Sequence, residues 1–209
     1  MTRLDELLAL LVRLGLGAAL LWRGLDPYLA PSTAQLGSPA TLALGPAWSM
    51  LGLLLLTGVL TRPSATLAAG LLAIAILDGG VAGLGDIKDV GLLGGAVSLA
   101  LTGSRLFSVD AGLALVLPHY VLAARPSRRA LQYSHLALRF GLALTLVVSG
   151  LDKSAFTSGT ERYVSAVVAT GGVPHWPVVG GSSPTLLVLW MGMGELLLGA
   201  ALLLGLLTH

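Results

Sequence analysis

The sequence predicts an all-α fold, a polytopic membrane helix bundle with about six transmembrane helices, and three observations lead to this class. The chain of 209 residues is 55% hydrophobic and 11% charged, whereas a soluble domain carries about 25% charged residues. Its mean hydropathy is +0.88. It contains 28 glycines, and small residues let membrane helices approach closely. The charged residues are too few to coat a water-soluble globule.

Composition and motifs also exclude several classes of function. The chain has no cysteine, which removes disulfides, thiol redox chemistry and iron–sulfur ligation. A net charge of +2 with few basic residues gives no reason to expect a nucleic-acid partner. Neither a phosphate loop, a dinucleotide fingerprint nor a nucleophile elbow is present. No histidine–carboxylate spacing suggests a metal site. We therefore expect no catalytic residues, no metal and no intrinsic cofactor.

Six apolar segments are each close to the ~20 residues that a bilayer core requires. They cover residues 7–25, 41–60, 64–81, 87–101, 133–151 and 185–207. Residues typical of turns separate the first segments, at Asp26-Pro27, Arg62-Pro63, Gly83 with Gly85, and Gly103-Ser104. The first segment is expected to be a retained helix, because Asp5 and Glu6 interrupt the basic region that a signal peptide would need.

Residues 106–124 are apolar enough to form a seventh span, but we expect an amphipathic or re-entrant stretch at the cytoplasmic interface. Asp110, Pro118 and His119 weaken a crossing helix, and a crossing would move the basic cluster 125–129 to the outer side. The orientation follows from the excess of basic residues in cytoplasmic loops. Six basic residues share one side if both termini are cytoplasmic: Arg3, Arg62, Arg105, Arg125, Arg128 and Arg129. The other side holds Lys88, Lys153 and Arg162.

The chain contains a weak internal repeat. Arg13 and Asp26 recur as Arg139 and Asp152 at one offset (139 − 13 = 126; 152 − 26 = 126). The string Gly-Val-Leu-Thr at 58–61 recurs as Gly-Leu-Leu-Thr at 205–208, at an offset of 147 (205 − 58). Both copies would begin on the cytoplasmic side, so the repeat is parallel. The first unit has four predicted spans and the second has two.

Several strings resemble the DoxX/DoxD superfamily of small bacterial membrane proteins. The similar strings are Ser149-Gly-Leu-Asp-Lys153, Glu195 with Gly-Leu-Leu-Thr at 205–208, and Gly103-Ser-Arg-Leu-Phe-Ser-Val-Asp110. The resemblance covers about 7–112 and 133–209. It implies a DoxX-like four-helix unit at 1–112, a cytoplasmic interfacial linker at 113–132, and a partial second unit at 133–209, with two helices and a long outer loop.

The first unit departs from the family pattern at two positions. Trp48 stands where the second unit has Glu195 (195 − 147 = 48), and Pro27 stands where it has Lys153 (153 − 126 = 27). Only the second unit keeps the whole polar set.

The resemblance implies an integral membrane subunit of a quinone-linked oxidoreductase assembly, similar to thiosulfate:quinone oxidoreductase, that docks other redox subunits and shapes a quinone site. It also implies the cytoplasmic membrane of a bacterium or archaeon. The alternative is a purely structural or assembly subunit of a larger membrane complex. A transporter of small solutes or anions ranks third.

Glu195, near the middle of the last span, is the first candidate for a functional residue, since an acid at a helix centre costs roughly 2.5–3.5 kcal/mol. Arg139 lies thirteen residues before Asp152 (152 − 139 = 13), roughly 20 Å below the outer surface, and Glu195 lies roughly 15 Å down the last span. These depths predict an Arg139–Glu195 pair. It is either a salt bridge that fixes helix register or a proton or quinone site, with Trp190 stacking on a quinone ring. In the remaining alternative the two residues are unpaired and Arg139 extends to the cytoplasmic face.

Two further sets of charged residues are candidates. Arg23 and Asp78 approach the same side and are expected to form a second buried pair. Five residues are expected at the outer ends of helices, where they either form a mouth for an anionic substrate or mark helix ends: Asp26, Asp86, Asp89, Asp152 and Lys153.

Overall fold

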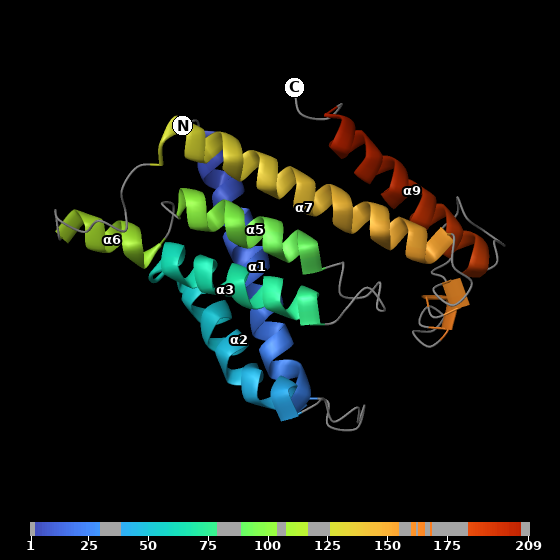
Figure 1. Ribbon diagram of the computed structural model, residues 1–209, viewed down its shortest axis with the longest axis horizontal. Helices are drawn as coiled ribbons and strands as arrows, with labels where there is room; N and C mark the ends of the chain where they lie inside the picture. Colours follow the sequence, from blue (N-terminus) through green and yellow to red (C-terminus); the bar gives the residue numbers. More distant parts are fainter. Residues whose placement is uncertain are drawn as a thin grey trace. The chain divides into compact units, whose positions relative to one another are not determined.

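Every element in the described part of the computed structural model is a helix. The described residues are 3–29, 39–78, 89–103, 108–116, 126–154, 160–161, 163–165, 168 and 184–205. The helices are α1 (Arg3–Leu29), α2 (Pro39–Thr57), α3 (Thr61–Asp78), α5 (Asp89–Thr102), α6 (Val109–Val116), α7 (Arg128–Ser154) and α9 (Pro184–Leu204) (Figure 1). All except α6 overlap the apolar segments expected from the sequence, so the all-α prediction is confirmed for these residues.

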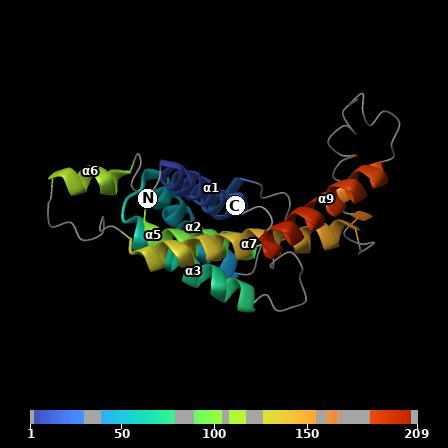
Figure 2. The ribbon, with the colours of Figure 1, turned by 90° about the horizontal axis from the view of Figure 1, so that it is seen from above.

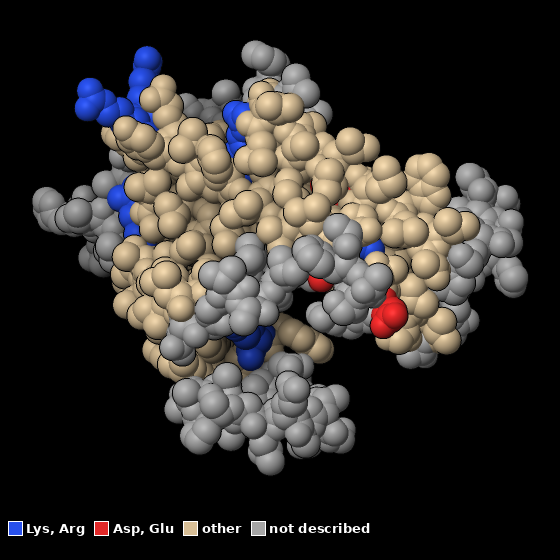
Figure 3. All heavy atoms as spheres, turned by 45° about the vertical axis from the view of Figure 1, so that its right-hand side comes forward, with Lys and Arg blue, Asp and Glu red and all other residues tan. Residues whose placement is uncertain are grey.

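Three helices are long and apolar enough to cross a membrane, judged by length and composition. They are Glu6–Leu25, Arg128–Ser154 and Thr185–Leu204. The apolar stretches Leu44–Thr57, Thr61–Leu77 and Asp89–Thr102 are shorter, and the 14 residues of α5 extend only about 21 Å, against a bilayer core of about 30 Å. On the face shown in Figure 3, uncharged residues form most of the described surface. The chain is therefore a helical membrane protein, and the number of six spans stays a prediction.

The chain divides into two compact units, which are described separately. Unit 1 comprises Met1–Ala75 and Leu92–Leu138, and unit 2 comprises Ile76–Gly91 and Arg139–His209. The domain limits expected from the sequence, at 112 and 133, stay a prediction, because a division by compactness does not test a repeat.

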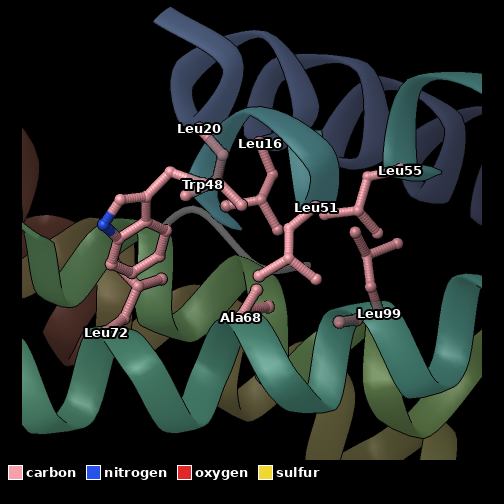
Figure 4. Packing of buried hydrophobic residues seen from close by; sticks show 10 residues of the cluster. Leu16, Leu20, Trp48, Leu51, Leu55, Ala68, Leu72 and Leu99 are labelled. Carbon is pink, nitrogen blue, oxygen red and sulfur yellow. The ribbon is translucent and has the colours of Figure 1, made fainter. Parts of the chain in front are cut away.

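The core of unit 1 lies between the α1–α2 hairpin and the small residues of α3 and α5. Trp48 is 6% exposed and points toward Leu72 of α3 (Figure 4). The other buried members of this cluster are Leu16, Leu20, Leu51, Leu55, Ala65, Ala68, Ala96 and Leu99. Alanines on α3 and α5 leave room for the leucines of α1 and α2, so the four helices interdigitate.

Close backbone contact joins α1 to α2. A Cβ atom built on Gly52 would lie 2.5 Å from the Leu21 nitrogen and 2.7 Å from the Gly17 oxygen. Only glycine permits this approach. In lipid, such packing takes the place of a hydrophobic driving force between helices.

The same kind of contact joins α7 to α9 within unit 2, where the two helices lie side by side (Figures 1 and 2). A Cβ atom on Gly199 would lie 2.8 Å from the Ala143 oxygen and 2.9 Å from the Val147 nitrogen. A Cβ atom on Gly150 would lie 2.6 Å from the Gly192 oxygen. Glycine therefore sets the separation of this hairpin too.

The two hairpins share one packing register. Residues 17 and 21 of α1 correspond to 143 and 147 of α7 at the offset of 126, and Gly52 of α2 corresponds to Gly199 of α9 at the offset of 147. Gly24 approaches the Gly45 oxygen as Gly150 approaches the Gly192 oxygen, at the same two offsets. This geometry is what a duplication would produce, and the duplication itself stays a prediction.

Helix α6 is too short to cross a bilayer, because its eight residues extend about 12 Å. The remainder of the ambiguous apolar segment, 117–125, lies outside the described residues. Asp110 at the start of α6 is buried. Its carboxylate accepts hydrogen bonds from the backbone N–H groups of Leu60 at 2.9 Å and Thr61 at 2.8 Å. An acid at the N-terminus of α3 satisfies donors that have no intrahelical partner, so Asp110 ties α6 to the turn between α2 and α3.

Candidate functional site

The central feature of unit 2 is an ion pair between α7 and α9. The Lys153 ammonium donates a hydrogen bond to Glu195 Oε1. The two side chains are 11% and 24% exposed, respectively. A Cβ atom on Gly192 would lie 2.9 Å from the Lys153 Cβ, and one on Gly150 would lie 2.9 Å from the Leu196 Cβ, so Lys153 and Glu195 both flank this close contact between the antiparallel helices. The local sequence thus places the pair where the hairpin is narrow.

One oxygen of this carboxylate is unused. Glu195 Oε2 is buried and has no hydrogen-bond partner among the described residues. A buried acceptor without a partner costs about 1–3 kcal/mol, and more when it is charged. An ionised carboxylate only accepts hydrogen bonds. The site can therefore accept one further hydrogen bond, from a group that carries a donor.

The segment after α7 adds an aromatic ring beside Lys153. The Lys153 ammonium lies 5.0 Å from the centroid of the Tyr163 ring, within the range of a cation–π interaction. The Thr160 hydroxyl donates a hydrogen bond to the Lys153 carbonyl at 2.7 Å. Lys153 is thus held between an acid on one helix and a ring from the following segment.

The expected Arg139–Glu195 pair is wrong. Arg139 Nε donates to the Leu202 carbonyl and Nη2 donates to the Leu203 carbonyl, each at 2.6 Å. The last carbonyls of a helix have no intrahelical partner, and a guanidinium there also complements the helix dipole. The depth estimate failed because it assumed that the two spans start at the same level. In the observed register Arg139 lies opposite the end of α9, seven residues or about 10 Å beyond Glu195.

Trp190 does not share the face of Glu195. Five residues separate the two (195 − 190 = 5), which places Trp190 about 140° around the helix. Its side chain is 71% exposed, so a ring stacked there would lie away from the carboxylate.

The structure tests the other expected residues only in part. The Arg23 guanidinium lies over the Trp48 ring, 5.3 Å from its centroid. The Asp78 side chain lies outside the described residues, and the Arg23–Asp78 pair stays a prediction. In the expected mouth, Asp152 and Lys153 are buried and Asp89 is half-buried, so the first two do not line an open mouth. Asp86 and the side chain of Asp26 lie outside the described residues.

Sequence reasoning missed Lys153 as the partner of Glu195, although a signal for it was present. The positions of both residues are replaced together in the first unit, by Pro27 and Trp48. Joint replacement of an acid and a base is what a direct contact between them would produce. Asp110 was noticed only as a residue that weakens a span, and its contacts to residues fifty positions earlier in the sequence have no local signature.

These features define a helical membrane protein with a semi-buried ion pair between two tightly packed helices. The DoxX family model matches residues 134–209. This match supports the resemblance to the DoxX superfamily that the sequence motifs indicated, and the matched part contains both Lys153 and Glu195. No curated protein matches the chain, and no solved structure does.

Proposed function

We propose that this protein is an integral membrane subunit of a quinone-linked oxidoreductase assembly, and that its α7–α9 hairpin contributes to a quinone site. The observation that carries the proposal is the Lys153–Glu195 pair with its unused oxygen, in the part of the chain that matches the DoxX family. In a narrower form of this proposal, which the resemblance to the DoxX/DoxD superfamily suggests, thiosulfate is the electron donor of the assembly.

The residues present fit a quinone. Its headgroup needs hydrogen-bond partners for two ring oxygens, and its tail needs an apolar surface. The ammonium of Lys153 has three donors, of which Glu195 Oε1 takes one, so another can donate to a ring oxygen of the quinone. Glu195 Oε2 can accept a hydrogen bond from the ring hydroxyl that reduction of the quinone creates. Met191 and Leu198 are exposed apolar side chains one turn to either side of Glu195.

In this proposal a bound quinone supplies the capacity to take up electrons and protons. The chain's residues do the rest: Lys153 orients a ring oxygen, and Glu195 holds a proton or accepts a hydrogen bond at Oε2. The electrons come from a partner subunit. We place the protein in the cytoplasmic membrane of a bacterium or archaeon with both termini cytoplasmic, since six basic residues then lie on the inner side.

The test is to purify the full chain from its native membrane with mild detergent, and to measure extracted quinone and co-purifying redox subunits. We expect quinone at near one equivalent per chain and at least one redox partner. In Lys153→Met the quinone content should fall, while in the matched control Arg129→Met, at an exposed position of α7, it should not. A chain that purifies alone and holds no quinone contradicts the proposal.

The second candidate is a purely structural subunit, and the packing of the pair favours it. Lys153 and Glu195 lie beside the Gly150–Gly192 contact, where an ion pair would fix helix register. In that case Glu195→Gln would lower the melting temperature of the assembly and leave its quinone content and turnover unchanged.

A further inference from the structure

The inner face of the α1–α2 hairpin in unit 1 serves as a reference for the corresponding face of the α7–α9 hairpin. That face consists of Leu16 and Leu20 from α1 and Trp48, Leu51 and Leu55 from α2. All five are buried under α3 and α5, as Figure 4 shows. A face with this register is therefore apolar and suited to a covering layer.

The corresponding face of the α7–α9 hairpin is only partly covered, and none of its residues is fully buried. The offsets of 126 and 147 lead to Leu142, Leu146, Glu195, Leu198 and Leu202. Leu142 is 45% exposed and Leu198 is 49% exposed, whereas Leu146 and Leu202 are half-buried. We call these five residues, with Lys153, the open face. It combines a stripe of leucines with one charged end.

The charged end distinguishes the two faces. In unit 1 the indole of Trp48 occupies the place of the acid and carries the Arg23 guanidinium over its ring. It also points toward Leu72, so the described residues of that face have a packed indole where the second hairpin has a carboxylate. In unit 2 the same place holds a carboxylate with an unused oxygen.

We infer that the open face binds the reduced, hydroxyl-bearing form of a membrane quinone, one molecule per chain, with a ring hydroxyl donating to Glu195 and the apolar tail lying along the leucines. This inference rests on the proposed function and adds the redox state, the stoichiometry and the place of binding. The reason is chemical. A quinol hydroxyl can donate to a carboxylate oxygen, and a quinone carbonyl cannot.

Access to the oxygen requires only a small motion. Oε2 is buried in the observed rotamer, but the side chain as a whole is 24% exposed. The terminal torsion of a glutamate is broad, so in this inference the carboxylate tilts toward the exposed part of its side chain and turns an oxygen to the open face. Lys153 can stay bound to the other oxygen.

A site that accepts a hydrogen bond from a hydroxyl rejects the analogue that lacks it, because the acceptor is then left unpaired. A charged acceptor of this kind gives roughly tenfold discrimination or more. We therefore expect the quinol to bind at least about tenfold more tightly than the quinone.

The experiment uses the full chain in nanodiscs under anaerobic conditions. A short-tailed ubiquinol and the matching ubiquinone are titrated by calorimetry, and an azido-quinone is used to map the bound residues. The wild type should bind one quinol per chain, with labelling on α7 and α9. Glu195→Gln, which keeps the shape and can both donate and accept, should bind both forms with nearly equal affinity. Leu198→Trp should block the open face and weaken both ligands more than tenfold.

The matched control is Leu197→Trp. Residue 197 is also exposed, but two residues from Glu195 place it about 160° away around α9, so binding should not change. Equal affinity for both redox forms or an unaffected Leu198→Trp variant would overturn the inference and leave the proposed function standing. Labelling on α1 and α2 in place of α7 and α9 would overturn both, because the proposed function places the quinone site at the α7–α9 hairpin. No binding of either form would overturn both.

Discussion

The hairpins α1–α2 and α7–α9 have the same packing register and opposite chemistry. In both, glycine-mediated contacts occur at positions related by offsets of 126 and 147. In the first hairpin the inner face is leucine and tryptophan under a layer of helices, and in the second it bears Lys153 and Glu195. The difference shows that the same glycine-mediated hairpin accommodates either an apolar or a charged inner face. The lysine–glutamate pair is therefore not needed to form the hairpin.

A second comparison concerns the two arginines of the repeat, which have a structural place in both units. Gly58 and Gly205 follow the ends of α2 and α9 with φ of +72° and +78°, a conformation that favours glycine. A Cβ atom on Gly58 would lie 2.6 Å from Arg13 Nη1, and one on Gly205 would lie 2.7 Å from Arg139 Nη2. Each arginine therefore sits at the C-terminal turn of the partner helix. The feature that differs between the hairpins, and so the better candidate for function, is the lysine–glutamate pair.

The largest expected effect comes from placing the glutamate of the second hairpin at the corresponding position of the first. Trp48→Glu removes a buried indole, which costs about 3–5 kcal/mol, and buries a carboxylate in a hairpin that has Pro27 in place of the lysine. We expect most of the variant to fail to fold, measured as the monodisperse fraction in detergent. Adding Pro27→Lys should restore part of it. A stable Trp48→Glu variant would contradict the assignment of this face as core.

Breaking the pair in the second hairpin should have the next largest effect. Lys153→Met leaves the Glu195 carboxylate without its partner, and we expect a loss of about 3 kcal/mol, the lower end of the range for buried pairs because both side chains are partly exposed. Thermal unfolding in one detergent measures the loss. Lys153→Met with Glu195→Leu should recover much of it, and a double variant no better than the single one would argue against direct contact.

The glycine contacts predict a third, smaller effect that is equal in the two hairpins. Gly52→Ala and Gly199→Ala each place a methyl group within 3 Å of backbone atoms, so each should cost about 1–3 kcal/mol. Gly194→Ala is the control, because a Cβ atom there meets nothing within 4 Å. Unequal losses of unfolding free energy at residues 52 and 199 would show that the same packing register does not stabilise the two hairpins equally.

The smallest effect is expected at the turn of unit 1. Asp110→Ala removes the two backbone hydrogen bonds at the start of α3, and loss of such a cap costs about 1 kcal/mol. The expected result is a fall of a few degrees in the melting temperature, together with faster hydrogen exchange at Leu60 and Thr61. Unchanged exchange at these amides would contradict the assigned contact.

The sequence was sufficient to place the helices and to single out Glu195, because apolar length and the cost of a buried acid are local properties. It was not sufficient to assign the partner. The register of α7 against α9 depends on which glycines meet, here Gly150 with Gly192, and no depth count along single spans contains that information. The role of Asp110 was equally hidden, since its hydrogen bonds reach back to Leu60 and Thr61. Trp190 is close to Glu195 in sequence but lies on another side of α9, because the face of a helix on which a residue lies depends on its angular position.

The central claim is that Lys153, and not Arg139, is the base that contacts Glu195. Double-mutant cycles on unfolding free energy test it directly, with Glu195→Gln combined in turn with Lys153→Met and Arg139→Met. The account predicts a coupling above about 1 kcal/mol with Lys153, as for residues in contact, and within about 0.5 kcal/mol of zero with Arg139. Strong coupling to Arg139 with none to Lys153 would contradict it.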